Sequence, residues 1–260
     1  MKTIAYYTFI EYIRKKILYI IAWIWALLMI STIIAWWLAL SEQAKVIRDF
    51  WIGLIEVAWI ILVVFFGTNV LQQEISQNTI FLLASKNIKR SNIILWKFFW
   101  FSGVILIFII LMWLLYWGIT NIFHIWFNSI QFIALIWIIV KLEVLLAICL
   151  VFASFVSPFV ALWSSLILYF LSHILSFVVY YTTVLKKELF WPLFSTVIKF
   201  FYYILPNFTA LSVQDFFDVP YLPQVIGKSF WFAVWFHIIY IIILLYIFKL
   251  QVHNSNSVHY

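Results

Sequence analysis

The sequence of 260 residues is poor in the residues on which most enzymes and soluble domains depend. Only 10% of its residues are charged, whereas a soluble domain carries about a quarter, because its surface must face water. Its single cysteine, Cys149, allows neither an intrachain disulfide nor a paired-cysteine metal site. Its five glycines form no phosphate-binding loop, and no HExxH zinc motif occurs. We therefore expect no catalytic residue, no metal site and no nucleotide site within this chain.

What the sequence has in excess is apolar side chains. They make up 67% of the residues, and the mean hydropathy is +1.12. A soluble fold cannot bury this much apolar surface, whereas a bilayer solvates it, and one span needs roughly 20 apolar residues. The sequence therefore predicts an all-α integral membrane protein with about six transmembrane helices. The predicted spans are 17–40, 50–71, 93–119, 130–153, 159–181 and 230–250.

The net charge of +7 reflects membrane topology and does not indicate a nucleic-acid partner. The basic residues lie between apolar spans, without forming a patch or a motif, and such residues accumulate on the cytoplasmic side. With the N-terminus inside, that side holds Lys2, Arg14, Lys15, Lys16, Lys86, Lys89, Arg90, Lys97 and Lys249. The first outer loop then holds only Lys45 and Arg48. We predict an N-in, C-in multi-pass protein of the plasma (inner) membrane.

Besides the loops that join neighbouring spans, three segments are predicted to lie outside the membrane-spanning helices. Residues 1–16 have Ile4, Tyr7 and Ile10 at helical spacing among basic residues, which indicates an amphipathic helix on the lipid headgroups. The alternative is a simple basic flank of the first span. Residues 182–229 are too long for an unstructured loop, so we expect one or two short helices at or within the outer leaflet. Residues 251–260 form a polar cytoplasmic tail.

Polar residues inside predicted spans form a candidate site, because each charge there costs a few kcal/mol unless it is paired or hydrated. They are Glu56, Lys141, Glu143 and His173. Glu56 is near the outer end of its span, within reach of headgroup water. Lys141 and Glu143 are two residues apart and point to different helix faces, so they are poor partners for each other. Two interpretations are open: bonds that assemble neighbouring helices, or the lining of a translocation path or subunit interface. For His173, and for His237 in the sixth span, the alternatives are hydrogen-bonded packing and a proton relay.

The most specific segment is QQEISQNTIFLLASKNIKRSNIILWKFF, residues 72–99. It resembles the first cytoplasmic loop of ABC-2-type transporter permeases, in which an acidic residue, a threonine, a leucine pair, a basic turn and a Gly-Lys helix start follow one another. The matching residues are Glu74, Thr79, Leu82, Leu83, Ile88, Arg90 and Lys97. Asn87 and Trp96 depart from the family's usual proline and glycine. Residues 142–173 and 202–216 resemble the same family.

This resemblance implies a permease subunit of an ATP-driven exporter. It further implies a homodimer or heterodimer of permeases, and a separate ABC ATPase subunit that binds the ATP and docks on a coupling loop at about 72–92. From the residues alone, an amphipathic segment with Ile80, Leu82 and Leu83 beside charges suits a protein contact. A linker lying on the headgroups is the alternative. The rival function is a non-transporting membrane scaffold or assembly factor, and no lining residue identifies a substrate.

Sixteen tryptophans against five glycines is an unusual ratio, because glycine is frequent in membrane helices and helix packing favours small residues. Tryptophan is common at the two membrane–water interfaces, but this does not explain Trp25, Trp59 and Trp137, which lie in the middle of predicted spans. Trp96 stands where the resembling family has glycine. We hypothesise that some of these residues are glycines, encoded by UGA in a genome that decodes UGA as glycine. The alternative is a protein that is rich in tryptophan.

The coding DNA tests this hypothesis directly. We expect UGA triplets at Trp96 and at the mid-span tryptophans, because there the residue type conflicts with close helix packing. UGG at these positions rejects the hypothesis and establishes tryptophan.

Overall fold

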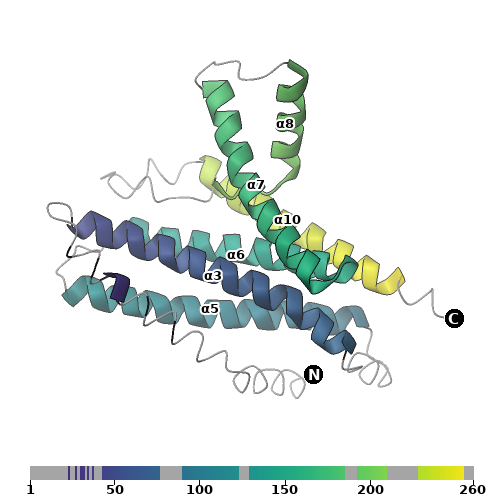
Figure 1. The fold of residues 1–260 in the computed structure, drawn as a ribbon, viewed down its shortest axis with the longest axis horizontal. Helices are drawn as coiled ribbons and strands as arrows, with labels where there is room; N and C mark the ends of the chain where they lie inside the picture. The colour runs from purple at the N-terminus through teal and green to yellow at the C-terminus, as the bar shows by residue number, and fades with distance from the viewer. Residues whose placement is uncertain are drawn as a thin grey trace.

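The computed structural model describes residues 23, 27, 30–32, 34, 37, 43–76, 90–122, 129–184, 192–209 and 228–254. These parts of the chain are helical and contain no strand, which confirms the predicted all-α class. The longer helices are α3 (Gln43–Ser76), α5 (Arg90–Ile122), α6 (Ser129–Phe155), α7 (Pro158–Val184), α8 (Pro192–Ile204) and α10 (Lys228–Asn254) (Figure 1).

Four of these helices are long and apolar enough to cross a membrane: Asp49–Asn69, Phe98–Ile122, Gln131–Phe155 and Pro158–Val179. They correspond to the second to fifth predicted spans. The apolar part of α10, Phe232–Ile247, is shorter. The interfacial segment 1–16 and most of the predicted first span lie outside the described residues. The number of six spans and the N-in, C-in orientation therefore stay predictions.

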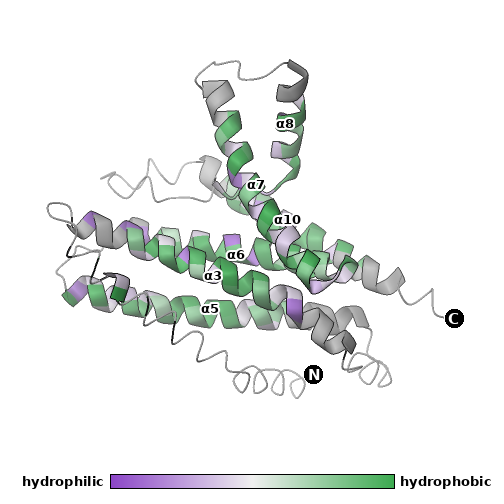
Figure 2. Cartoon of the chain, in the orientation of Figure 1, coloured by the Kyte–Doolittle hydropathy of each residue, from purple (hydrophilic) through white to green (hydrophobic). Residues whose placement is uncertain are grey.

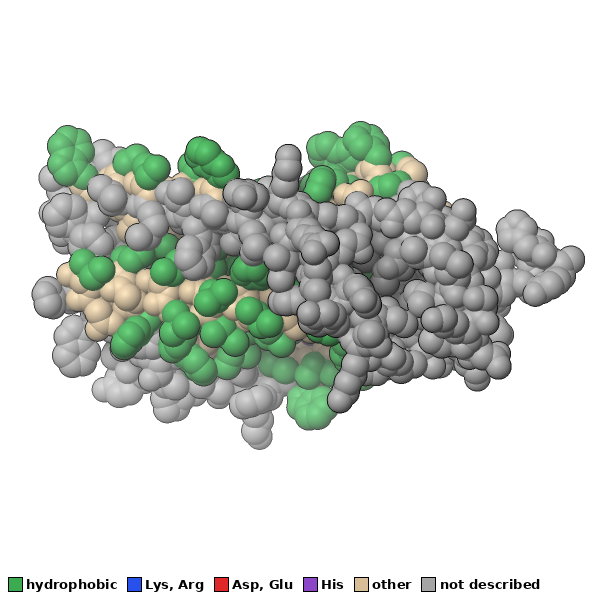
Figure 3. All heavy atoms as spheres, turned by 90° about the horizontal axis from the view of Figure 1, so that it is seen from below, with side chains coloured by type: hydrophobic (Ala, Val, Ile, Leu, Met, Phe, Trp, Pro, Cys, Tyr) green, Lys and Arg blue, Asp and Glu red, His purple; other side chains and the backbone are tan. Residues whose placement is uncertain are grey.

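The long helices are apolar on all sides, as expected for helices surrounded by lipid and by one another. Figure 2 shows them hydrophobic over most of their described length. Large apolar side chains also remain exposed on the protein surface, as Figure 3 shows for one face. Examples are Ile61 and Phe65 on α3, Ile107 and Ile110 on α5, Phe170 and Phe177 on α7, and Ile242 on α10. In a bilayer, the lipid tails cover such side chains.

Helix α6 is the centre of the fold. It packs against α3, α5, α7 and α10, and its contacts with α3 are the most extensive. A run of seven consecutive residues, Val144–Leu150, is no more than 3% exposed, so neighbouring helices enclose α6 on every side at this level. Figure 1 shows α3, α5 and α6 running side by side.

At Gly67, helix α3 lies close against α6. A Cβ atom at this position would lie 3.0 Å from the Cys149 Cβ and 3.3 Å from the Leu146 Cδ1. By contrast, a Cβ atom at Gly103 on α5 would meet nothing within 4 Å. The small residue at Gly67 is what lets the two backbones approach, as small residues commonly do in membrane helix pairs.

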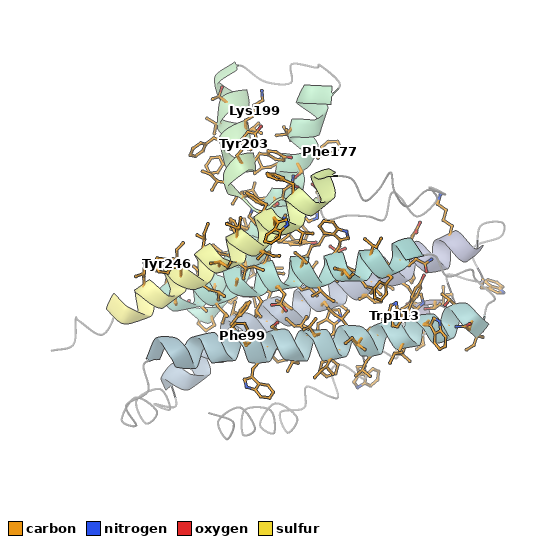
Figure 4. The ribbon with its side chains drawn as sticks, turned by 180° about the vertical axis from the view of Figure 1, so that it is seen from behind. Phe99, Trp113, Phe177, Lys199, Tyr203 and Tyr246 are labelled. Carbon is orange, nitrogen blue, oxygen red and sulfur yellow. The ribbon has the colours of Figure 1, made fainter. Side chains whose placement is uncertain are left out.

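Helix α8 is the short helix expected in the segment 182–229. It packs against α7, and the later part of α7 projects from the bundle together with α8 as a hairpin, whereas the first part of α7 packs on α3 and α6 (Figures 1 and 4). Proline at the first position suits the start of both helices, since its missing N–H is not needed there. Two residues, Val156 and Ser157, separate α6 from α7, and α8 ends just before Pro206.

Two of the mid-span tryptophans lie in helix contacts and not on the lipid-facing surface. Trp59 is 4% exposed and Trp137 is 2% exposed. Within the described part of the chain, the indole N–H of Trp59 has no hydrogen-bond acceptor, which is costly in a region without water. These are positions where glycine would let helices approach, so the hypothesis of UGA-encoded glycine stays a prediction with a packing rationale.

Substitution of Gly67 by leucine should loosen the α3–α6 contact. The added side chain overlaps Cys149 and Leu146, and such overpacking costs about 1–3 kcal/mol. Gly103→Leu is the matched control, because the same side chain there has open space. We expect a clear drop in the thermal unfolding midpoint of the detergent-solubilised protein for Gly67→Leu alone. Equal drops for the two variants would contradict this account of the contact.

Candidate functional site

Three helices meet at one carboxylate oxygen, Oε1 of Glu56 on α3. The Lys141 Nζ on α6 donates a hydrogen bond to it at 2.8 Å, and the Tyr169 hydroxyl on α7 donates another at 3.0 Å. The side chains of Lys141 and Glu56 are 4% and 12% exposed. A buried charge is tolerated only when it is paired and hydrogen-bonded. The ion pair therefore links α3, α6 and α7 at this point.

Its place near the outer end of the predicted span suggested that the Glu56 carboxylate reaches headgroup water, and the structure shows a different environment. It is turned toward α6 and α7 and is nearly enclosed, so it does not depend on headgroup water. The physical reason is the lysine on the facing helix, whose ammonium would otherwise lie unpaired among apolar side chains.

Glu143 faces a different neighbour, as its spacing from Lys141 indicates. The Ser102 hydroxyl on α5 donates a hydrogen bond of 2.6 Å to the Glu143 Oε1. Helix α6 thus carries one polar attachment to α3 and α7 through Lys141 and another to α5 through Glu143.

A cluster of aromatic rings adjoins the ion pair. The Tyr169 ring centroid lies 4.6 Å from that of His173 and 5.0 Å from that of Phe208. Phe208 is fully buried, is stacked with His173 at 6.2 Å and lies 6.5 Å from His237 on α10. The ring cluster therefore extends from the ion pair to α10 through Phe208.

The residues 205–209, hereafter the re-entrant turn, are held against α7 by hydrogen bonds. The Ser172 hydroxyl donates to the Pro206 carbonyl and accepts from the Phe208 N–H at 3.4 Å. The Ser176 hydroxyl donates to the Asn207 Oδ1 at 2.9 Å. Ser172 and Ser176 lie within the apolar span Pro158–Val179. The chain that leaves α8 therefore returns to the last third of that span.

The two histidines within spans make similar bonds to their own helices. The Nδ1 of His173 lies 3.1 Å from the Tyr169 carbonyl, and the Nδ1 of His237 lies 2.6 Å from the Ala233 carbonyl. Because a carbonyl only accepts, each Nδ1 carries the proton in these bonds. The Nε2 of His237 has no hydrogen-bond partner among the described residues, although the backbone of Asn207 is close to the ring.

Several of these residues were not among the sequence candidates: Tyr169, Ser172, Ser176, Asn207 and Phe208. For three of them, a signal exists in the sequence together with the candidate His173. Positions 169, 172, 173 and 176 are polar and follow the 3- and 4-residue spacing of one helix face within an apolar span. No comparable pattern marks Asn207 or Phe208, whose place depends on the path of the chain after α8.

The coupling-loop candidates are described only in part. Glu74 lies in the last turn of α3, and Arg90 and Lys97 lie in α5, but their side chains are outside the described set. Thr79, Leu82 and Leu83 lie outside the described residues. Within the described residues, no group of three His, Cys, Asp or Glu could hold a metal ion.

The apolar helices and their buried ion pair are those of an all-α membrane protein. No family model, no curated protein and no solved structure matches the chain.

Removal of one partner of the ion pair should destabilise the protein strongly. Glu56→Gln leaves the Lys141 ammonium buried and unpaired, at a cost of about 3–5 kcal/mol. The double variant Glu56→Gln/Lys141→Met removes both charges and should recover most of this loss. Unfolding of the purified protein in detergent measures both effects.

Lys199→Met is the matched control, since this lysine is exposed on α8 and should tolerate the change (Figure 4). Strictly additive losses in the double variant would show that the two side chains do not stabilise each other.

Proposed function

We propose that the chain is the permease subunit of an ATP-driven transporter of the ABC-2 type, coupled to a separate ATPase subunit. The resemblance of residues 72–99 to the coupling loop of that family is the starting point. The observation that carries the proposal is the continuity of α3, which holds both Glu74 of the loop and Glu56 of the ion pair in one helix, Gln43–Ser76.

The lengths of the two helices next to the loop support docking of a soluble partner. With 34 residues, α3 is about 51 Å long, whereas the hydrocarbon layer is about 30 Å thick. Helix α3 continues for seven residues beyond the apolar span that ends at Asn69, and α5 starts eight residues before the span that begins at Phe98. In this proposal the two extensions are the parts of α3 and α5 that stand beyond the hydrocarbon layer, on the side where the ATPase subunit docks.

In this proposal the chain supplies the membrane path and the partner supplies the chemistry. The ATPase subunit binds and hydrolyses ATP, and its movement is passed to the coupling loop. A second permease subunit, identical or homologous, completes the path, and export is the direction that the resemblance implies. The protein would lie in the plasma (inner) membrane with both termini inside.

Charge reversal in the loop tests the proposal. We expect the affinity-tagged chain, purified from its native membranes, to carry an ATPase subunit with ATP-hydrolysing activity. Glu74→Lys and Arg90→Glu should each remove most of that bound activity, because docking surfaces lose affinity when like charges face each other.

Lys199→Glu reverses an exposed charge on α8, outside the loop, and should leave the bound ATPase activity unchanged. A wild-type chain that purifies without any ATPase would reject transport and favour the membrane scaffold.

A further inference from the structure

We infer that Glu143, in the middle of α6, is the counter-charge of a binding site for a lipophilic organic cation that enters from the bilayer. As a statement about the substrate, the inference rests on the proposed function and adds the substrate class to it. The site itself is defined by the depth of Glu143, by its neighbours on α5 and α6, and by the distribution of basic residues in the sequence.

The first step concerns the charge of Glu143, which is the central residue of the apolar span Gln131–Phe155. The Ser102 hydroxyl donates a hydrogen bond to it at 2.6 Å, but a hydroxyl brings no positive charge. A charge at the middle of a bilayer is costly until an opposite charge compensates it. Within the described residues, Glu143 lacks the cation that Lys141 provides for Glu56.

The second step is that a second copy of this chain has no further cation to offer at this depth. The six predicted spans contain three lysines and no arginine. Lys141 is already in an ion pair, and Lys97 and Lys249 lie near the ends of their spans. His173 and His237, the histidines within spans, belong to the ring cluster on α7 and α10. We therefore assign the missing cation to a ligand.

The third step is that Glu143 lies on the face of α6 that borders the lipid. Phe132, Ile136, Ile139 and Glu143 follow one another at spacings of four, three and four residues, which places them on one helix face, hereafter the α6 stripe. Phe132 is 50% exposed and Ile136 is 45% exposed, whereas Ile139 and Glu143 are partly buried. The residues that follow, Val144–Leu150, are enclosed. Glu143 is therefore the inner end of an apolar stripe that begins at the lipid.

The fourth step is that α5 borders the α6 stripe at both of its ends. At the outer end, the Phe132 ring meets the Trp113 ring of α5 edge-on, with centroids 5.7 Å apart. At the inner end, Ser102 of α5 holds the Glu143 carboxylate. Glu143 follows Phe132 by 11 residues, or about 16 Å along the helix. The stripe therefore offers an apolar and aromatic surface of molecular length that ends at a single negative charge.

These properties select the chemical class of the ligand. A lipid tail covers the apolar side chains but leaves the carboxylate uncompensated. A hydrated inorganic cation compensates the carboxylate but has no favourable contact with the apolar side chains and loses its water in this layer. A lipophilic organic cation does both, because its apolar groups cover the stripe while its charge faces Glu143.

Equilibrium dialysis of the purified chain in a neutral detergent tests the site, with tetraphenylphosphonium as the probe. Triphenylphosphine oxide, a neutral molecule with the same aryl–phosphorus groups, is the matched ligand control. We expect the phosphonium to bind at least about tenfold more tightly than the oxide, which is the factor that one contact to a charged group typically brings.

Glu143→Gln tests the carboxylate while its shape is kept. The amide oxygen still accepts from Ser102, so the thermal unfolding midpoint should stay that of the parent. The affinity for tetraphenylphosphonium should fall at least about tenfold, and the affinity for the oxide should not change. Asp49→Asn removes a carboxylate from the outer end of the span Asp49–Asn69 and is the matched control, which should bind both ligands as the parent does.

Three results overturn the inference: no binding of the phosphonium, equal binding of the two ligands, or unchanged phosphonium binding in Glu143→Gln. It is also overturned if Glu143→Gln separates the permease subunits, because the carboxylate then belongs to a subunit contact.

Failure of the proposed function is distinguishable, since the dialysis does not involve the ATPase subunit. A chain that binds the phosphonium through Glu143 but purifies without an ATPase rejects the proposed function and upholds the binding site. In the complete complex, the phosphonium should raise ATP hydrolysis in the parent and not in Glu143→Gln. An active complex whose hydrolysis ignores the phosphonium overturns its assignment as a substrate.

Discussion

The structure depends on one constraint, which is that a charge within an apolar layer must have a partner. Lys141 is 4% exposed among apolar helices, and the carboxylate of Glu56 is what allows it to remain charged there. Because Tyr169 shares the same carboxylate oxygen, the positions of α3, α6 and α7 are determined together and not pair by pair. Lipid-exposed helices without such contacts are held mainly by the fit of their side chains.

The central position of α6 follows from the same constraint. Lys141 and Glu143 are two residues apart, so they leave the helix on different faces, and each needs a partner from a different direction. Glu56 satisfies the first from α3, and Ser102 satisfies the second from α5. A helix with polar groups on two sides must be enclosed, and the burial of the following residues Val144–Leu150 agrees with this.

The parts of the fold that could be predicted are those that depend on local composition. Four spans follow from the length and hydropathy of continuous segments, and the break after α8 follows from Pro206. The separate orientation of Lys141 and Glu143 follows from helix geometry. The pairing of Glu56 with Lys141 could not be predicted, because the two residues are 85 positions apart and their contact depends on how α3 and α6 rotate against each other. Phe208 was missed because its burial depends on the return of the chain after α8.

The polar groups of α7 show how the ion pair and the re-entrant turn depend on each other. Non-helical backbone at the depth of a span needs partners from protein, and Ser172 and Ser176 supply them to residues 206–208. Tyr169, one turn earlier on the same face, supplies a donor to Glu56. One face of α7 therefore stabilises both the re-entrant turn and the ion pair, although no polar contact between the turn and the ion pair is described. The bonds of the turn and the bond of Tyr169 to Glu56 therefore both depend on the rotation of α7 about its own axis.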